Sequence, residues 1–439
     1  MQLPAEFQAR MQALLGEQYP AYWLAMQQPP QRGLRVNTLK TGVETFLQRS
    51  PWPLQPTGLV QEGFLLSNDI TRIGSHPLHR AGLFYMQEPS AMRTAALLSP
   101  QPGMRVLDLC AAPGGKAGQL AAYLKGEGLL VANELVPARA AVLAGTLERL
   151  GVRNALCTCM NPESLCELFA GYFDAVLVDA PCSGEGMFRK EPQAVTAWSV
   201  AHVLSCAARQ SHILDSAAAA LRPGGRLAYS TCTFAPEEDE QAIRAFLSRH
   251  PSFALLCEER HYPHTGPGEG HFVALLQKQD GTVQTCISEA RPLLVPREAA
   301  LAWDAFVKEN MKTPPKGDPL LLPDGRLVLL PQGVPAGYDR LRLRSAGVHA
   351  AEYKNGRFTP AHGLCMAYPA SAFLRTVELK EAELDKYFSG NTVQISNDLS
   401  GFCVVCAQGY PVGWGKAVQG VLKNHLPKGL RGPIGERTE

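Results

Sequence analysis

The sequence predicts an α/β protein built around a doubly wound parallel sheet. Between residues 81 and 278, short apolar runs rich in β-branched residues alternate with longer helical stretches. A glycine-rich turn, Cys110–Lys116, follows the first of these strands and begins a helix. A second turn, Asp179–Lys190, follows the fourth strand and holds an acid, a thiol and a basic pair. Open α/β sheets bind ligands at the carboxyl ends of their strands, so function is expected there.

The alternation places the elements of this region in order. The expected strands are Gly103–Leu109, Leu129–Glu134, Asn154–Thr158, Phe173–Val178, Arg226–Ser230, Phe253–Leu256 and His271–Leu276. The expected helices are Ala117–Leu124, Pro137–Leu150, Ala201–Leu221 and one near Glu237–Leu247. The stretch Arg222–Gly225 predicts a helix end followed by a turn, because it contains proline and two glycines.

Length and composition limit the class of protein. A chain of 439 residues suits two to four domains, and 46% hydrophobic residues suffice for a sizeable core. The net charge of +2 means that a nucleic-acid surface must be a local patch. The start, Met1–Glu6, does not resemble a signal peptide, and no run is long enough to cross a membrane. Twelve scattered cysteines are therefore expected to be reduced thiols, as in a cytoplasmic protein.

Residues 1–80 predict a small N-terminal α+β module. The first 30 residues favour helix up to Pro29 and Pro30, and Gly33–Lys40 favours a short strand and turn. This strand carries Arg35. Taken alone, Arg35 is expected to be an ordinary solvated surface arginine.

The last 160 residues break the regular alternation. Residues 279–345 are rich in proline and short apolar strands, and residues 346–439 favour a small β-rich domain. Between Pro411 and Gly435 there are four basic residues and no acid. With the aromatic residues among them they match what single-stranded RNA requires, although an ordinary basic tail is an equal alternative: Lys416, Lys423, Lys428 and Arg431, with Tyr410, Trp414 and His425.

Metal binding is not expected. Cys403 and Cys406 lie in an apolar strand-like run that would turn their thiols to opposite faces. Cys157 and Cys159 are too close together for the usual zinc spacing, and the pair in His261–His264 has no second pair beside it.

The first glycine turn lies between a strand and a helix, where α/β proteins bind nucleotides, but its glycines are not spaced as in a dinucleotide-binding turn. Cys110–Lys116 lacks the G-x-G-x-x-G pattern, and Pro113 shapes a different turn. Glu134 ends the second strand, where an acid can bind both hydroxyls of a ribose. This combination favours an adenosine ligand without a pyrophosphate, such as S-adenosylmethionine. An NAD enzyme remains the generic alternative.

Two cysteines follow neighbouring strands. Cys182 comes after the fourth strand and Cys232 after the fifth, and adjacent parallel strands end about 5 Å apart. A thiolate that adds to carbon 6 of cytosine makes carbon 5 nucleophilic, which allows methylation of an otherwise unreactive carbon. Positive charge is expected to favour the thiolate, with Lys190, Arg189 and Lys116 available. Two buried structural thiols are the less favoured interpretation.

The motifs together resemble those of the NOL1/NOP2/Sun family of RNA cytosine-5 methyltransferases, and most closely its bacterial RsmF branch, which modifies small-subunit ribosomal RNA. The resemblance covers nearly the whole chain. It rests on motifs in matching order: Arg35–Thr38, Tyr85–Met92, Asp108–Lys116, Asp179–Lys190, Ser230–Thr233, Gly413–Lys416 and Lys423–Arg431.

The resemblance implies a fold and a division of the chain. It implies a Rossmann-like class I methyltransferase domain, a small N-terminal module and a PUA-like C-terminal domain. The expected boundaries are 1–80 for an N-terminal RNA-binding module, 81–278 for the methyltransferase, 279–345 for an intervening RsmF-type segment and 346–439 for the PUA-like domain.

The resemblance also implies roles for individual residues. Cys232 would be the nucleophile, Cys182 would aid product release, and Asp179 would assist at ring nitrogen 3 of cytosine. Asp179 could donate there only if desolvation raised its pKa. The family often has Asp where this chain has Asn161, which puts the contribution of that position to adenine binding in doubt. The S-adenosylmethionine site would comprise Cys110, Ala111, Ala112, Pro113, Gly114, Gly115, Lys116, Glu134, Arg139, Asn161 and Asp179.

The sequence is therefore interpreted as a cytoplasmic S-adenosylmethionine-dependent enzyme that forms 5-methylcytidine, with 16S ribosomal RNA or the small ribosomal subunit as partner. No metal and no membrane are expected, and a monomer is favoured. The alternatives are the same chemistry on transfer RNA, a DNA cytosine methyltransferase, and a ribosome-assembly factor in which catalysis is dispensable. Intact Cys232 and an intact glycine turn argue against the last of these.

Overall fold

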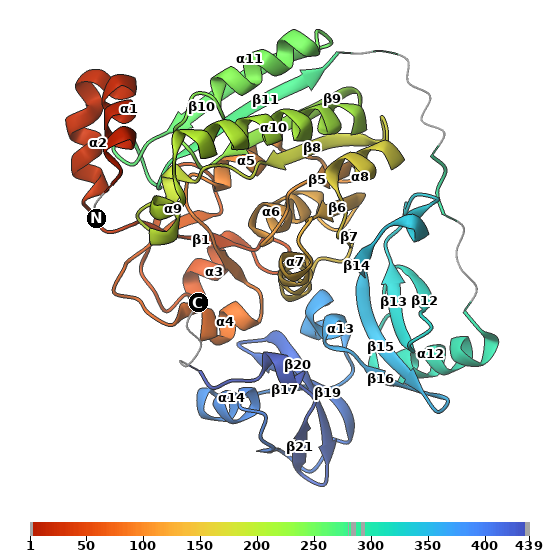
Figure 1. The fold of residues 1–439 in the computed structure, drawn as a ribbon. Helices are drawn as coiled ribbons and strands as arrows, with labels where there is room; N and C mark the ends of the chain where they lie inside the picture. The colour runs from red at the N-terminus through yellow and green to blue at the C-terminus, as the bar shows by residue number, and fades with distance from the viewer. Residues whose placement is uncertain (1–2, 280, 282–286, 291–294, 435–439) are drawn as a thin grey trace.

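The computed structural model describes residues 3–279, 281, 287–290 and 295–434. Figure 1 shows a central sheet with helices on both faces, an N-terminal module beside it and two β-rich units after it. None of the helices in these described ranges is both long and apolar enough to cross a membrane.

The central sheet has eight strands in the order β10-β11-β9-β8-β5-β6-β7-β14. The strands from β9 to β7 run parallel to one another, whereas β11 and β14 run antiparallel to their neighbours. Their bounds are β5 (Arg105–Asp108), β6 (Leu129–Asn133), β7 (Ala155–Thr158), β8 (Phe173–Asp179), β9 (Leu221–Thr231), β10 (Phe253–His261), β11 (His271–Lys278) and β14 (Leu343–Ala346).

Helices cover both faces of this sheet, so its strands are buried on both sides, as parallel sheets require. On one face, Leu120 and Leu143 pack against Val106 of β5. On the other face, Leu214 and Phe246 belong to the core that contains Val176 and other strand residues. The first layer comprises α5 (Met92–Leu98), α6 (Gly115–Leu124) and α7 (Pro137–Leu150), and the second α8 (Pro162–Leu168), α10 (Val200–Ala220) and α11 (Glu240–Arg249). The predicted doubly wound fold is confirmed.

The prediction of a turn at Arg222–Gly225 was wrong. The strand β9 already begins at Leu221 and continues through this stretch. The register between β8 and β9 shifts between Phe173 and Ala175, which leaves the extra residues in a bulge. Gly224, with a φ of +74°, adopts there the left-handed conformation that glycine tolerates.

In its described residues, the N-terminal module combines four α-helices with a four-stranded sheet of order β2-β3-β1-β4. The sequence alone predicted that Arg35 on β1 would be a solvated surface arginine. This prediction was wrong, because only 2% of Arg35 is exposed. Its guanidinium donates to the side chain of Gln87 and to the carbonyl of Gly115, at the start of α6. The elements are α1 (Ala5–Leu15), α2 (Tyr19–Met26), β1 (Arg32–Val36), α3 (Val43–Arg49), β2 (Leu54–Pro56), β3 (Gly63–Leu66), α4 (Pro77–Arg80) and β4 (Phe84–Met86).

A four-stranded antiparallel sheet of order β12-β13-β15-β16 follows the central domain. Between its strands, β14 leaves to pair with β7 at the edge of the central sheet. This pairing joins the chain after residue 279 to the central domain through backbone hydrogen bonds. The elements are α12 (Arg297–Asn310), β12 (Asp318–Leu321), β13 (Arg326–Leu330), β15 (Val348–Lys354), β16 (Arg357–Pro360) and α13 (His362–Ala367).

The C-terminal unit is a five-stranded sheet of order β17-β19-β20-β21-β18. Trp414, expected to be a stacking surface for RNA, is 2% exposed and donates its indole N–H to the carbonyl of Ala361 at 3.0 Å. Lys416 and Lys423 remain exposed, and Lys416 lies over the ring of Phe402 at 5.2 Å. The elements are β17 (Thr376–Glu378), α14 (Glu381–Phe388), β18 (Val393–Gln394), β19 (Gly401–Ala407), β20 (Tyr410–Val418) and β21 (Val421–Asn424).

Replacing Arg35 should destabilise the protein. An Arg35→Ala variant leaves the buried acceptors of Gln87, Gly115 and Gln119 without this donor, and each buried unsatisfied group costs about 1–3 kcal/mol. We expect a loss of about 3 kcal/mol in the free energy of unfolding, measured by urea denaturation. Exposed Arg72→Ala serves as the control and should change it by less than about 0.5 kcal/mol. An equal, small effect of both variants would contradict the structural role of Arg35.

Candidate active site

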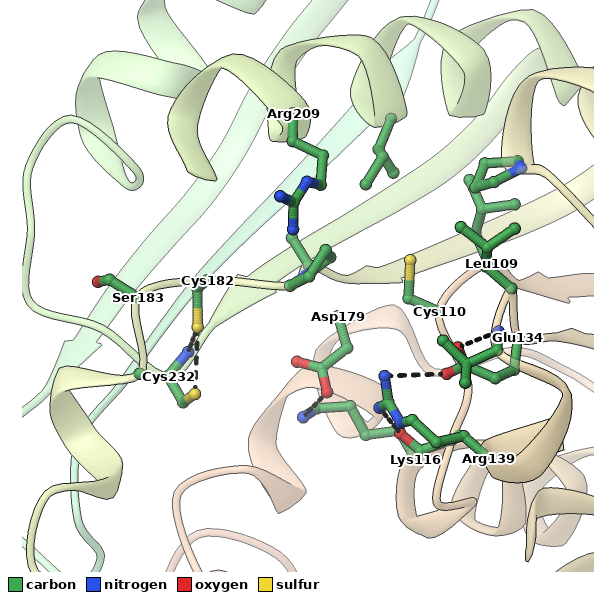
Figure 2. Close-up of a pocket in the computed structure, with 18 of the residues that line it drawn as sticks. Leu109, Cys110, Lys116, Glu134, Arg139, Asp179, Cys182, Ser183, Arg209 and Cys232 are labelled. Carbon is green, nitrogen blue, oxygen red and sulfur yellow. Dashed lines mark hydrogen bonds and ion pairs between the residues drawn. The ribbon is translucent and has the colours of Figure 1, made fainter. Parts of the chain in front are cut away.

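One large pocket lies at the carboxyl ends of β5, β6, β8 and β9, with a volume of about 1160 Å³. Figure 2 shows the two cysteines at one end and the glycine turn with Glu134 at the other. The pocket lies where the sequence predicted a ligand site. Of the residues predicted for the site, those lining it are Cys110, Ala112, Pro113, Lys116, Glu134, Arg139, Asn161, Asp179, Cys182 and Cys232.

The turn Cys110–Lys116 forms the floor of the pocket. Gly114 has a φ of +112°, and a Cβ there would approach Thr146 of α7 to 2.8 Å. Glycine is therefore required for the chain to turn directly into α6, which begins at Gly115. The first backbone N–H groups of a helix have no partner within it, so this turn offers donors to an anionic or polar ligand.

Glu134 lies just beyond β6 and is fixed from two sides. Its carboxylate accepts the backbone N–H of Val136 at 2.9 Å and pairs with Arg139 at 3.3 Å. Arg139 also donates to the carbonyl of Ala112 at 3.0 Å, which ties α7 to the glycine turn. Asn161 caps α8, since its side-chain oxygen accepts the N–H of Glu163 at 2.9 Å. These contacts preorganise the end of the pocket farthest from the thiols.

Asp179 occupies the centre of the pocket. It forms an ion pair with Lys116 at 2.8 Å and accepts the hydroxyl of Ser230 at 2.9 Å. Its side chain is still 34% exposed. Asp179 is therefore only partly removed from water, whereas the role expected from the sequence requires its desolvation.

Asp108 is a buried acid that sequence reasoning missed. It ends β5 beneath the pocket, and neither side-chain oxygen has a hydrogen-bond partner among the described residues. Burial, together with the nearby charge of Asp179, raises the pKa of Asp108 to about 8. Asp108 is thus mostly protonated at neutral pH. Its position at the end of an apolar strand was the available signal.

The two thiols meet as predicted. Their sulfurs are 3.2 Å apart, and the backbone N–H of Cys232 donates to the sulfur of Cys182 at 3.4 Å. The hydrogen bond to Cys232 and burial raise the pKa of Cys182 well above its ordinary value.

Two of the three cations expected beside the thiols, Arg189 and Lys116, are engaged with other groups. Arg189 forms a buried ion pair with Glu269 at 2.6 Å and donates to the carbonyl of Ala25. Lys116 is paired with Asp179. The expectation that Arg189 would favour a thiolate was wrong, because a sequence does not show which acid an arginine meets in the fold.

A buried polar cluster supports the loop of Cys182. Glu238 accepts the N–H of Ser183 at 3.0 Å and the side chain of Gln210 at 2.7 Å, and Gln210 also donates to the carbonyl of Pro181. Burial raises the pKa of Glu238 to about 7. Glu238 and Gln210 were placed in predicted helices from the sequence and given no role at the site. The signal was the run of four acids, 237–240, just after Cys232.

Among the described residues, no group of three or more His, Cys, Asp or Glu side chains is arranged to hold a metal ion. The pocket instead combines hydrogen-bond donors, paired charges and a thiol pair. This arrangement suits a nucleoside-containing cofactor beside a site of covalent chemistry.

Sequence relatives identify the family. The chain is 32% identical to ribosomal RNA small subunit methyltransferase F of Erwinia tasmaniensis, with 97% of this chain and 96% of that protein covered. It is 34% identical to the protein of the same name from Klebsiella pneumoniae, with 97% and 96% covered. This chain belongs to the RsmF family of RNA methyltransferases.

Four family models match successive parts of this RsmF chain. The model of the 16S rRNA methyltransferase RsmB/F matches residues 95–281, and the model of the RsmF N-terminal domain matches residues 3–89. The first C-terminal domain of RsmF rRNA methyltransferase matches residues 305–368, and the RsmF PUA domain matches residues 374–432. The predicted family, the enzyme class and the PUA-like domain are confirmed.

Solved structures agree with the RsmF fold. A methyltransferase homologue from Pyrococcus horikoshii has a TM-score of 0.55 at 31% identity, with 60% of this chain and 91% of that chain covered. NSun6 from Pyrococcus horikoshii, solved with the S-adenosylmethionine analogue SFG, has a TM-score of 0.58, with 63% and 99% covered. Its 21% identity shows a shared fold.

Asp108 should make the stability of the RsmF chain depend on pH. Its pKa is about 8 when folded and ordinarily 3.8, so between these values the folded state holds a proton that the unfolded state releases. Unfolding is therefore favoured as pH rises, and Asp108→Asn removes this contribution. Between pH 5 and 7, the unfolding free energy of the wild type should fall relative to Asp108→Asn by up to about 1.4 kcal/mol per pH unit. Parallel curves in urea denaturation at several pH values would contradict a protonated Asp108.

Proposed function

We propose that this RNA methyltransferase transfers a methyl group from S-adenosylmethionine to carbon 5 of cytidine in 16S ribosomal RNA. The observation that carries the proposal is the contact of 3.2 Å between the sulfurs of Cys182 and Cys232 inside the pocket. Carbon 5 of cytosine is not nucleophilic by itself. Covalent addition of a thiolate at carbon 6 is the chemical solution, and a second group is needed to reverse it.

The residues at the far end of the pocket fit S-adenosylmethionine. Glu134 presents a carboxylate for the ribose hydroxyls, and the exposed side chains of Leu135 and Val136 offer an apolar surface for adenine. The glycine turn and the start of α6 offer backbone donors for the methionine portion. Arg139 holds Glu134 in place, and Asn161 borders the adenine side. The cofactor, when bound, supplies an electrophilic methyl group.

The thiol end of the pocket fits a cytosine turned out of its stack. Cys232 adds to carbon 6 as its thiolate, and the proton that the thiol gives up passes to ring nitrogen 3, where the Asp179 carboxylate accepts the resulting N–H; carbon 5 is then rich in electrons. Once carbon 5 is methylated, Cys182 would give up its thiol proton to solvent and, as a thiolate, remove the proton from carbon 5. The bond from Cys232 to carbon 6 then breaks, Cys232 leaves as a thiolate, and nitrogen 3 returns its proton through Asp179. Lys116, paired with Asp179, keeps the carboxylate directed into the pocket.

The raised pKa of Cys182 supports this division of roles. A thiol that keeps its proton at rest is a poor nucleophile, whereas its conjugate base is a strong proton acceptor. We therefore assign the attack to Cys232 and the proton transfer to Cys182.

Surfaces outside the pocket would hold the flanking RNA. The C-terminal unit presents exposed Lys416 and Lys423 beside the ring of Phe402, a combination of charge and stacking surface suited to single-stranded RNA. Loops and single strands are the favoured substrates, because turning out their bases costs least.

Replacement of each cysteine should separate the two roles. With 16S RNA and S-adenosylmethionine, Cys182→Ala should accumulate a denaturation-resistant protein–RNA adduct and turn over at least about 100-fold more slowly. Cys232→Ala should form no adduct and be inactive. Gel electrophoresis under denaturing conditions measures the adduct, and buried Cys206→Ala, on α10, serves as the control cysteine. The reverse pattern of adducts would overturn the assignment.

The substrate can be tested in the cell. Bisulfite sequencing of 16S ribosomal RNA should show at least one cytosine that loses its methyl mark when the gene is deleted. Wild-type protein should restore the mark and Cys232→Ala should not. An unchanged cytosine map would reject 16S ribosomal RNA as the substrate.

A further inference from the structure

Three lysine and arginine side chains line the pocket, and two of them are paired with acids. Lys116 is paired with Asp179 and Arg139 with Glu134. Arg209 also lines the pocket and is exposed. No ion pair or side-chain hydrogen bond joins the Arg209 guanidinium to any residue that the structure describes. An uncompensated arginine in a pocket is a binding group for an anion.

Arg209 lies on the wall opposite the glycine turn. It projects from α10, and Figure 2 shows its guanidinium reaching over the segment between Asp179 and Cys182. The same face of α10 lines the pocket with His202 and His212. The acid on this face, Asp215, is already paired with Arg249 and His250. Arg209 is therefore not neutralised by the acid of its own helix, although Glu163, Glu167 and Glu191 from other segments also line the pocket.

Two anions could meet Arg209, the carboxylate of the methionine portion and a phosphate of the RNA. In the proposed function the carboxylate is assigned to the backbone donors at the start of α6, on the opposite wall. The pocket, at about 1160 Å³, is also larger than the roughly 300–1,000 Å³ that small ligands commonly occupy. Space near Arg209 thus remains for the sugar and phosphate of a nucleotide whose base reaches the thiols.

We propose that Arg209 binds the phosphate of the target cytidine and so positions the base over Cys182 and Cys232. The proposal rests on the proposed function, since it requires that cytidine enter this pocket. Planar guanidinium binds phosphate through two parallel hydrogen bonds, which fixes orientation as well as charge. Arg209 is therefore a positioning residue: it would contact the phosphate and would not distinguish one base from another.

The test compares cytidine with cytidine 5′-monophosphate, which differ by the phosphate alone. Calorimetry of the full chain with S-adenosylhomocysteine present measures both affinities. The wild type should bind the monophosphate about tenfold more tightly than cytidine. In Arg209→Gln this ratio should fall to about one while the affinity for cytidine itself is unchanged. Arg209→Lys should keep part of the ratio, because it retains the charge and loses the planar pair of donors.

The matched control is Arg244→Gln, an exposed arginine on α11 outside the pocket, which should leave the ratio at its wild-type value. An unchanged ratio in Arg209→Gln would overturn the proposal. A loss of S-adenosylhomocysteine affinity in that variant would also overturn it, because Arg209 would then serve the cofactor. If the wild type binds neither cytidine nor its monophosphate, the cytidine pocket of the proposed function fails as well.

Discussion

The parallel pairing of β8 with β9 is the constraint on which the candidate active site depends. This pairing sets Asp179 opposite Ser230, and Cys182 lies three residues after the end of β8 while Cys232 directly follows the end of β9. The two sulfurs consequently meet at 3.2 Å without any long-range loop to bring them together. The buried cluster around Glu238 then holds the loop of Cys182 against the end of β9. A shift of one residue between these strands would separate the thiols and turn Asp179 out of the pocket.

Buried polar contacts make the surrounding modules part of the same structure. Arg35 of the N-terminal module donates to the carbonyl of Gly115, the residue at which α6 begins. Asn37 donates to the carbonyls of Gly82 and Leu150, which fixes β1 to the end of α7. These groups are costly to leave without partners, so the modules are held in defined positions beside the pocket. The floor of the pocket is therefore supported from outside the methyltransferase domain.

The sequence predicted the sheet and the thiol pair because both follow from local patterns. Alternating apolar runs identify parallel strands, and a cysteine just after each of two such strands must lie at one edge of the sheet. The burial of Arg35 and Trp414 was not predicted, because it depends on surfaces that meet only after the modules have packed. Asp108 and Glu238 were missed for a related reason. The end of an apolar strand at Asp108 and the run of four acids around Glu238 were the local signals, but neither pattern shows that the fold will enclose the side chain and raise its pKa.

The thiol pair also contains the means to change roles during the reaction. At rest, the hydrogen bond to Cys232 is the largest cause of the raised pKa of Cys182, followed by burial and the charge of Cys232. In the proposed adduct the sulfur of Cys232 would carry no charge, so this cause of the raised pKa of Cys182 would be removed. The backbone N–H of Cys232 still donates to the sulfur of Cys182 and stabilises its thiolate. Formation of the adduct would thus create the base that later removes the proton from carbon 5, which explains why two thiols, rather than one thiol and a distant base, lie in contact.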